Sequence, residues 1–95
     1  MSPELKVELK RLRKQRFYYL TSKGDKYLWM DRDGKPHQML NMRLDHLQAC
    51  IRLVRKDMLP RVWSSISNEA RLKLEPKAFR KLKELKEAFS TKAVV

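Results

Sequence analysis

An apolar stripe between residues 42 and 58 restricts the fold of this chain more than any other feature. Its side chains recur every three or four positions, which is the spacing of one face of an α-helix. The stripe consists of Leu44, Leu47, Ile51, Val54 and Met58. Asn41 stands where a helix N-cap is expected, and Pro60 stops or kinks the helix. The sequence therefore predicts a helix at about 42–58, whose apolar face the rest of the 95 residues must cover.

The amino-terminal residues predict a second amphipathic helix over 3–16. Serine is a good N-cap and proline is tolerated at the first helical position, so Ser2-Pro3-Glu4 is a helix start. Leu5, Leu9 and Leu12 then recur on one face, and basic side chains occupy the adjoining face. We expect this helix to place a basic stripe beside a buried leucine face.

The second half of the chain predicts two more helices. Residues 61–72 have the weaker pattern of a short helix, which Ser67-Asn68-Glu69 would break or recap. Pro76 suits the first position of a last helix over 76–90. Residues 91–95 are expected to form a frayed tail.

Residues 17–40 have the chemistry of strands and turns. Aromatic, β-prone runs at 17–21 and 27–30 flank a polar turn segment. A second turn contains the pair Asp33-Gly34, which is typical of tight hairpins, and a short third strand is expected over 37–40. The segment therefore predicts two consecutive hairpins, that is, a small antiparallel β-meander at about 17–40.

These elements predict a single α+β domain over residues 1–95, with helices packed on one face of a small sheet. A chain of this length has room for one domain and not for two. The residues expected to share the core are apolar side chains from the sheet and from each helix. They are Leu9, Leu12, Tyr19, Leu28, Met30, Leu44, Leu47, Ile51, Val54, Trp63, Leu82, Leu85 and Phe89.

The charge of the chain indicates an anionic partner. Lysine and arginine total 23 and aspartate and glutamate total 11, which gives a net charge of +12. Self-repulsion of that size opposes compaction, and a bound anion would relieve it and stabilise the fold by mass action. The excess lies at the two ends, because residues 1–26 and 71–95 each carry eight basic and three acidic side chains. The ends are therefore the expected basic surface.

The candidate binding site is a basic cluster that runs directly into Phe17-Tyr18-Tyr19. Lysine and arginine neutralise phosphates and release condensed counterions, and aromatic faces stack on unpaired bases. Tyr18 is the stacking candidate, because strand alternation places it opposite its two aromatic neighbours. The leading interpretation is a non-enzymatic protein that contacts DNA, RNA or a nucleoprotein complex mainly through phosphates. The expected phosphate contacts are Lys10, Arg11, Arg13, Lys14 and Arg16, extended by Lys23 and Lys26.

Two other interpretations of the same charge stay open. The basic surface could occupy an acidic groove on a host protein, as in an inhibitor or adaptor of the host-takeover or anti-defence kind. It could also be a solvated helix face above core aromatic side chains. Trp63 and Phe79 help to discriminate. Exposure of both on one patch would favour a protein interface, and burial of both would favour nucleic acid.

No group of residues has the spacing of a catalytic or metal site, and we expect neither an enzyme nor a metal or other cofactor. His46 and Cys50 are one helical turn apart, but the sequence lacks a second pair at ligand spacing. The segment Asp31-Arg32-Asp33-Gly34 matches only the opening of a calcium loop. Uncharged stretches reach only seven residues, far short of a membrane span or a secretory signal. We therefore expect a cytoplasmic, intracellular protein without a membrane partner.

Residues 27–56 resemble small uncharacterised proteins of bacteriophages and prophages. The shared pattern is an aromatic strand, an Asp-Gly hairpin and a helix reading Met-x-x-x-His-Leu-x-x-x-Ile. The matching positions are Trp29, Gly34, Met42, His46, Leu47 and Ile51. The resemblance implies a structural unit in which His46 buttresses the hairpin. It also implies a role in handling nucleic acid or in binding a host machine, carried by the helices outside this unit.

Overall fold

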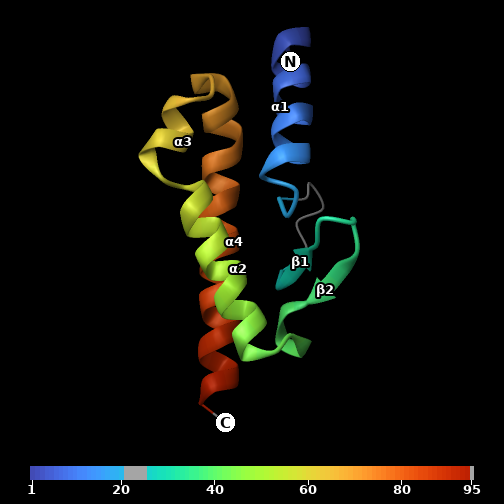
Figure 1. The fold of residues 1–95 in the computed structure, drawn as a ribbon, viewed down its shortest axis with the longest axis vertical. Coiled ribbons are helices and arrows are strands. Elements are labelled where there is room, and N and C mark those ends of the chain that lie inside the picture. The colour runs from blue at the N-terminus through green and yellow to red at the C-terminus, as the bar shows by residue number, and fades with distance from the viewer. Residues whose placement is uncertain (21–25, 95) are drawn as a thin grey trace.

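Helix α4 (Asn68–Ala93) runs along the long axis of the molecule, and the other helices pack around it (Figure 1). The computed structural model describes residues 1–20 and 26–94. Helix α1 (Pro3–Gln15) lies beside the first half of α4, and α2 (Leu44–Asp57) lies along its second half. A two-stranded hairpin lies below α1 in this view. The fold class is α+β, as predicted. No helix in the described part of the chain is long and apolar enough to span a membrane.

Helix α2 confirms the apolar stripe, with one exception at its beginning. Leu47, Ile51 and Val54 are buried against α4. Leu44 was expected in the core, but it is 39% exposed because it is the first residue of α2 and lies at the open end of the helix. The N-cap is Arg43 and not Asn41, which instead ends a short 3-10 helix, η1 (Met39–Asn41).

Helix α1 forms as the sequence predicts. The Ser2 hydroxyl accepts a hydrogen bond of 3.1 Å from the amide of Leu5, so it satisfies one of the free N–H groups at the helix start. Leu5, Leu9 and Leu12 are buried. The helix ends at Gln15, with Arg16 as its C-cap.

The strand predicted at 17–21 is not formed in its described part, residues 17–20. Phe17 and Tyr19 are fully buried and stack on two tryptophans. The ring of Phe17 lies 5.5 Å from that of Trp63, and the ring of Tyr19 lies 4.8 Å from that of Trp29. The aromatic side chains therefore fill the core between α1, α3 and the hairpin, and the meander reduces to one hairpin. The predicted turn at 22–25 lies outside the described residues.

The remaining hairpin pairs β1 (Leu28–Met30) with β2 (Pro36–Gln38) in antiparallel register. These are the second and third predicted strands. The Asp31 carboxylate organises the turn between them, because Oδ1 accepts hydrogen bonds from the amides of Asp33 and Lys35 at 2.9 and 2.8 Å. Gly34 has a φ of 81°, which glycine adopts readily and residues with a Cβ atom rarely adopt.

The hairpin presents the opposite face to the core from the one predicted. Trp29 is buried, whereas Leu28 and Met30 are only half-buried. Trp29 stacks on the buried ring of Tyr19, and this contact turns the Trp29 face of β1 toward the core.

The predicted boundary at Pro76 is wrong, because α4 continues through this residue. A short helix α3 (Pro60–Ser64) ends early, and the Ser67 hydroxyl caps α4 by accepting a hydrogen bond of 3.1 Å from the amide of Ala70. Leu74 and Ala78 are fully buried on either side of the proline. Packing of this face outweighs the backbone hydrogen bond that proline cannot make.

The expected frayed tail is also corrected, because α4 extends to Ala93. The ammonium group of Lys92 donates a hydrogen bond of 3.1 Å to the carbonyl of Leu40. This contact ties the end of α4 to the end of η1 and extends the helix beyond residue 90.

Candidate functional site

A groove between α1 and α4, of about 630 Å³, is lined almost entirely by cations. Met1 and Leu9 supply its apolar surface, and none of the described residues that line it is acidic. We call it the basic groove. Its cations are Lys6, Lys10, Arg13, Lys14, Lys73 and Lys77.

Helical periodicity explains why these side chains meet. On α1 the leucine face is buried, so the residues that directly follow each leucine lie on one flank of that face. On α4 Lys73 and Lys77 are four residues apart and therefore lie one above the other. Packing of the leucine face against α4 brings the two basic flanks to the same groove.

The cations of the basic groove repel one another. The pKa of Lys77 is lowered, first by burial and then by the positive charges of Arg13, Lys73 and Arg80. Within residues 1–20 and 26–94, none of the six groove cations forms an ion pair. An anion in this groove would therefore relieve a cost that the folded protein bears alone.

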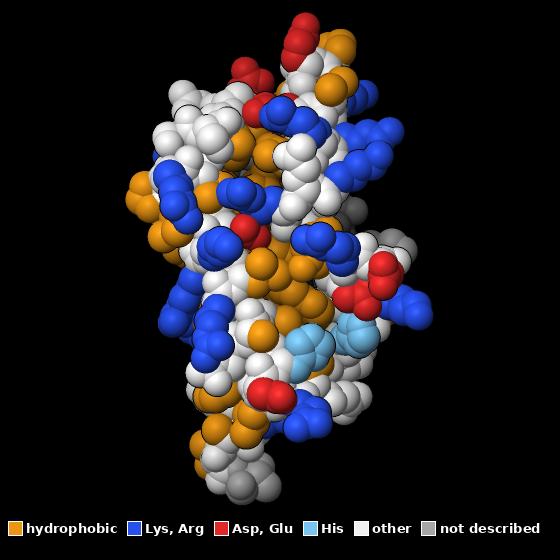
Figure 2. All heavy atoms as spheres, in the orientation of Figure 1, with side chains coloured by type: hydrophobic (Ala, Val, Ile, Leu, Met, Phe, Trp, Pro, Cys, Tyr) orange, Lys and Arg blue, Asp and Glu red, His pale blue; other side chains and the backbone are white. Residues whose placement is uncertain are grey.

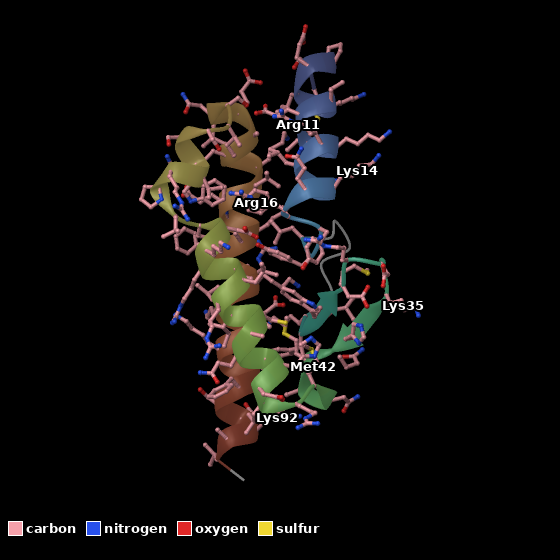
Figure 3. All side chains as sticks on the ribbon, in the orientation of Figure 1. Arg11, Lys14, Arg16, Lys35, Met42 and Lys92 are labelled. Carbon is pink, nitrogen blue, oxygen red and sulfur yellow. The ribbon has the colours of Figure 1, made fainter. Side chains whose placement is uncertain are left out.

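The structure divides the predicted basic cluster into three parts. Lys10, Arg13 and Lys14 line the basic groove. Arg16 turns the other way and places its Nε 3.7 Å from the Asp57 carboxylate on α2. Figure 3 shows Arg16 on the side of α1 that faces α2 and α4. Arg11 is exposed beside Glu8, whose pKa its charge helps to lower.

The other predicted contacts are scattered. Tyr18 is half-buried, and the guanidinium of Arg32 lies 5.3 Å from the centre of its ring. Its exposure relative to its fully buried neighbours agrees with the predicted alternation, although this segment is not a strand. Lys26 is exposed and does not line the basic groove. Lys23 lies outside the described residues.

Sequence reasoning missed the α4 side of the groove, Lys73 and Lys77. Both were visible at i, i+4 spacing, with Arg80 three residues further on. The predicted helices, 61–72 and 76–90, left Lys73 outside both and placed Lys77 in the last one. A continuous helix through this proline would have predicted one basic face.

A second cavity, of about 370 Å³, lies between the ends of α1, α2 and α3, and we call it the junction pocket. Sequence reasoning recognised Arg16 and Tyr18 but missed their neighbours. Figure 2 shows that lysine and arginine side chains are frequent on this face of the molecule, over α1 and α2. The charged residues that line the junction pocket are Arg16, Arg32, Lys56, Asp57 and Arg61.

The two hydrophobic residues chosen to separate the interpretations behave differently. Trp63 is buried in its stack on Phe17, whereas Phe79 is 58% exposed on α4. They do not form the shared exposed patch that would favour a protein interface. They are not both buried either, so this criterion decides for neither interpretation.

The histidine and cysteine side chains do not form a metal cluster in the described part of the chain. His37 contacts Asp31 at 2.8 Å, and its ring lies 6.4 Å from the ring of His46. The Cys50 thiol is buried, and burial raises its pKa to about 11, so it stays protonated at neutral pH. A protonated thiol is a poor metal ligand.

Comparison with protein-family models, with curated proteins and with solved structures gives no match. The functional argument therefore depends on the geometry of the chain itself. The resemblance of residues 27–56 to bacteriophage and prophage proteins stays a prediction. In the structure this segment contains the hairpin and most of α2, with His46 beside His37 of β2.

Proposed function

We propose that this protein is a non-enzymatic nucleic-acid-binding protein whose basic groove contacts phosphates. The observation that carries the proposal is the concentration of six cations in one groove, with no carboxylate among the described residues that line it. Lysine and arginine arranged along a groove track the backbone of a nucleic acid, and their affinity comes from the release of condensed counterions. Such binding is weakly sequence-specific and strongly dependent on salt.

A polymer fits this groove better than a small anion does. The cations are spread along two helices, from Lys6 to Lys14 on α1 and over a full turn of α4. Side chains one helical turn apart are separated by about 5–6 Å, so neighbouring cations suit successive phosphates of one strand. A single small anion would neutralise only part of this row.

The proposal includes no chemical step. The described residues that line the groove carry no carboxylate, imidazole or thiol. Its lysine and arginine side chains suit the binding of an anion, and we assign them no catalytic step.

The test is fluorescence anisotropy with labelled single-stranded RNA, single-stranded DNA and duplex DNA over a salt series. The groove variant replaces Lys10, Arg13 and Lys77 with Gln. The matched control replaces Lys35, Arg43 and Arg55, which are exposed and lie outside the groove, with Gln. Both variants lose the same charge, so they separate local contacts from net charge.

We expect the groove variant to reduce the slope of log affinity against log salt by about 2 to 3 units, because each lost phosphate contact contributes about 0.7 to 0.9. The control should change the slope much less. Equal slopes for the two variants would contradict the proposal. Circular dichroism and urea unfolding confirm that each variant is folded.

The alternative function, an inhibitor or adaptor that binds an acidic host protein, predicts a different result. Binding to every polymer would then disappear near physiological salt. The exposed ring of Phe79, in a shallow hollow with Tyr27 and Leu82, would supply apolar contact for such a partner. This hollow is lined by α4 and the hairpin, and none of its residues lines the basic groove.

A further inference from the structure

The junction pocket collects four cations from four different parts of the fold. Arg16 is the C-cap of α1, and Arg32 lies in the turn between β1 and β2. Lys56 lies in the last turn of α2, and Arg61 lies in α3. Arg16, Arg32 and the nearby residues Lys56 and Arg61 come from three distant parts of the sequence, so helical periodicity alone does not bring them together. The tertiary fold converges them on one cavity.

The pocket also has an apolar and aromatic wall. Leu53 and Val62 line it together with the half-buried ring of Tyr18. The guanidinium of Arg32 lies 5.3 Å from the centre of the Tyr18 ring, within the range of a cation–π contact. The volume of about 370 Å³ is within the range of small-molecule sites. A ligand that fills it needs both a planar or apolar part and a strongly anionic part.

Asp57 is the one carboxylate among the described residues that line the pocket, and it already makes contacts within the fold. It is 5% exposed and accepts a hydrogen bond of 2.7 Å from the Tyr19 hydroxyl. Its other oxygen lies 3.7 Å from Nε of Arg16, which it holds toward the pocket. Arg32, Lys56 and Arg61 form no ion pair with any residue in the described ranges. The pocket therefore keeps an excess of positive charge.

We propose that the junction pocket binds a phosphate monoester that carries a nucleobase, either the terminal nucleotide of a strand or a free nucleotide. A phosphate monoester carries a charge of about −1.5 to −2 at neutral pH, which suits several converging cations. Arginine forks bind its oxygens in pairs. The base would pack on Leu53, Val62 and Tyr18. A carboxylate ligand carries less charge and matches this set of cations less well.

The position of the pocket on α1 favours the terminal nucleotide of a strand, and this part of the inference rests on the proposed function. Arg13 and Lys14 line the basic groove, and the next two residues, Gln15 and Arg16, line the junction pocket. A strand whose backbone follows the groove and crosses the end of α1 would deliver its end to the pocket. The protein would then distinguish strand ends by their phosphate.

The experiment compares a 3′-labelled oligonucleotide of about ten nucleotides with and without a 5′-phosphate, by anisotropy at one salt concentration. Calorimetry with a nucleoside 5′-monophosphate, the nucleoside and inorganic phosphate tests the free ligand. The pocket variant carries Arg32→Gln and Arg61→Gln. The matched control carries Lys10→Gln and Lys77→Gln, which removes the same charge from the groove.

We expect the 5′-phosphate to tighten binding about tenfold, because one additional hydrogen bond to a charged group has about this effect on affinity. In the pocket variant the phosphorylated and unphosphorylated strands should bind equally well. In the control the tenfold preference for the phosphorylated strand should remain. Binding of the nucleoside monophosphate without any preference among strands would identify the free nucleotide as the ligand. If neither the phosphorylated strand nor the nucleotide binds through Arg32 and Arg61, the inference is overturned.

Failure of this inference is distinguishable from failure of the proposed function. A groove-dependent salt slope with no effect of the 5′-phosphate would leave the proposed function and remove the pocket assignment. Nucleotide binding that depends on Arg61, without any binding of strands, would keep the pocket assignment and remove the proposed function.

Discussion

Two lysines one turn apart on α4 have opposite environments. Lys81 is buried, and its ammonium group donates a hydrogen bond of 2.7 Å to the carbonyl of Leu28 and lies 3.3 Å from the Glu84 carboxylate. Lys77 faces the positive charges of Arg13 and Lys73, and its pKa is lowered. The charge of Lys81 holds the hairpin against α4, whereas Lys77 forms no ion pair with any described residue.

The acidic side chains show the same division. Most of them make a contact that holds an element or a turn in place. Glu8 accepts a hydrogen bond from Ser67, and Asp31 accepts one from Lys35. Asp57 accepts one from Tyr19, and both Glu84 and Glu87 accept one from Tyr27. The basic groove receives none of these carboxylates. Six of the 23 lysines and arginines of the chain therefore meet in the basic groove, and none of the six forms an ion pair within the described residues.

Replacing Lys81 with Met should give the largest effect on stability. The substitution leaves Glu84 buried without its cation and removes the hydrogen bond to Leu28. Breaking a buried pair in this way costs about 3 kcal/mol of unfolding free energy. Urea unfolding followed by tryptophan fluorescence measures the loss. The double variant Lys81→Met with Glu84→Gln should recover part of it, and a loss below about 1 kcal/mol in the single variant would contradict the role assigned to Lys81.

Replacing Tyr19 with Phe should cost about 2 kcal/mol, because it leaves the buried Asp57 carboxylate without its hydroxyl donor. Asp57 lies at the junction pocket, and its charge is engaged by contacts with Tyr19 and Arg16. Burial raises the pKa of Asp57 above its usual value of 3.8 in the folded protein. The folded state therefore binds this proton more tightly, and stability falls as the pH rises from 3.8 through the raised pKa.

The loss in Tyr19→Phe should accordingly shrink toward acidic pH, where Asp57 is protonated and needs no donor. Urea titrations at several pH values measure this dependence. A loss that is the same at every pH would show that Tyr19 acts through packing alone. Replacing Tyr27, whose hydroxyl contacts the exposed Glu87, with Phe is the matched control and should cost much less.

The sequence predicted those parts of the fold whose signal is periodic. The faces Leu5–Leu12 and Leu47–Val54 recur at helical spacing, and both are buried as expected. Phe17–Leu20 has β-prone residues but forms no strand, because stacking on Trp63 and Trp29 depends on residues distant in sequence. Local propensity does not contain this information.

The candidate site was predicted in the same uneven way. Lys10, Arg13 and Lys14 could be recognised because they form a stripe on one helix. Their partners on α4 were missed because a proline is a local signal for a helix boundary, and the buried face that carries α4 through Pro76 is a property of the whole fold. The junction pocket could not be predicted, since its cations come from distant parts of the chain.

Replacing Glu8 with Gln tests the acidic flank of α1, opposite the basic groove. Glu8 accepts hydrogen bonds from the hydroxyl and the amide of Ser67, which caps α4, and these contacts lower its pKa below 4.5. Because the group is near solvent, we expect a loss of about 1 kcal/mol at neutral pH. A lowered pKa contributes stability above pH 4.5, and this contribution disappears as the pH falls through the lowered value.

The difference in stability between wild type and Glu8→Gln should therefore close in acid. Urea unfolding at neutral and acidic pH measures it. Glu4→Gln, at an exposed position in the first turn of the same helix, is the control and should show a smaller difference at neutral pH. A constant loss for Glu8→Gln across pH would assign its effect to shape and not to charge.

Lys77→Met should have the smallest effect on stability, although it is the same substitution as Lys81→Met one helical turn earlier. Burial and the neighbouring cations both disfavour the charge of Lys77, so removing it should stabilise the protein by about 0.5 kcal/mol at most at low salt. Added salt screens this repulsion, so wild-type stability should rise with ionic strength more than that of the variant does. The folded pKa of Lys77 is lowered, so wild-type stability should also rise with pH between that value and 10.5. Urea unfolding in low and high salt measures both proteins side by side. A loss as large as that of Lys81→Met would mean that the fold uses Lys77 too, and the basic groove would no longer hold charge in reserve for a polyanion.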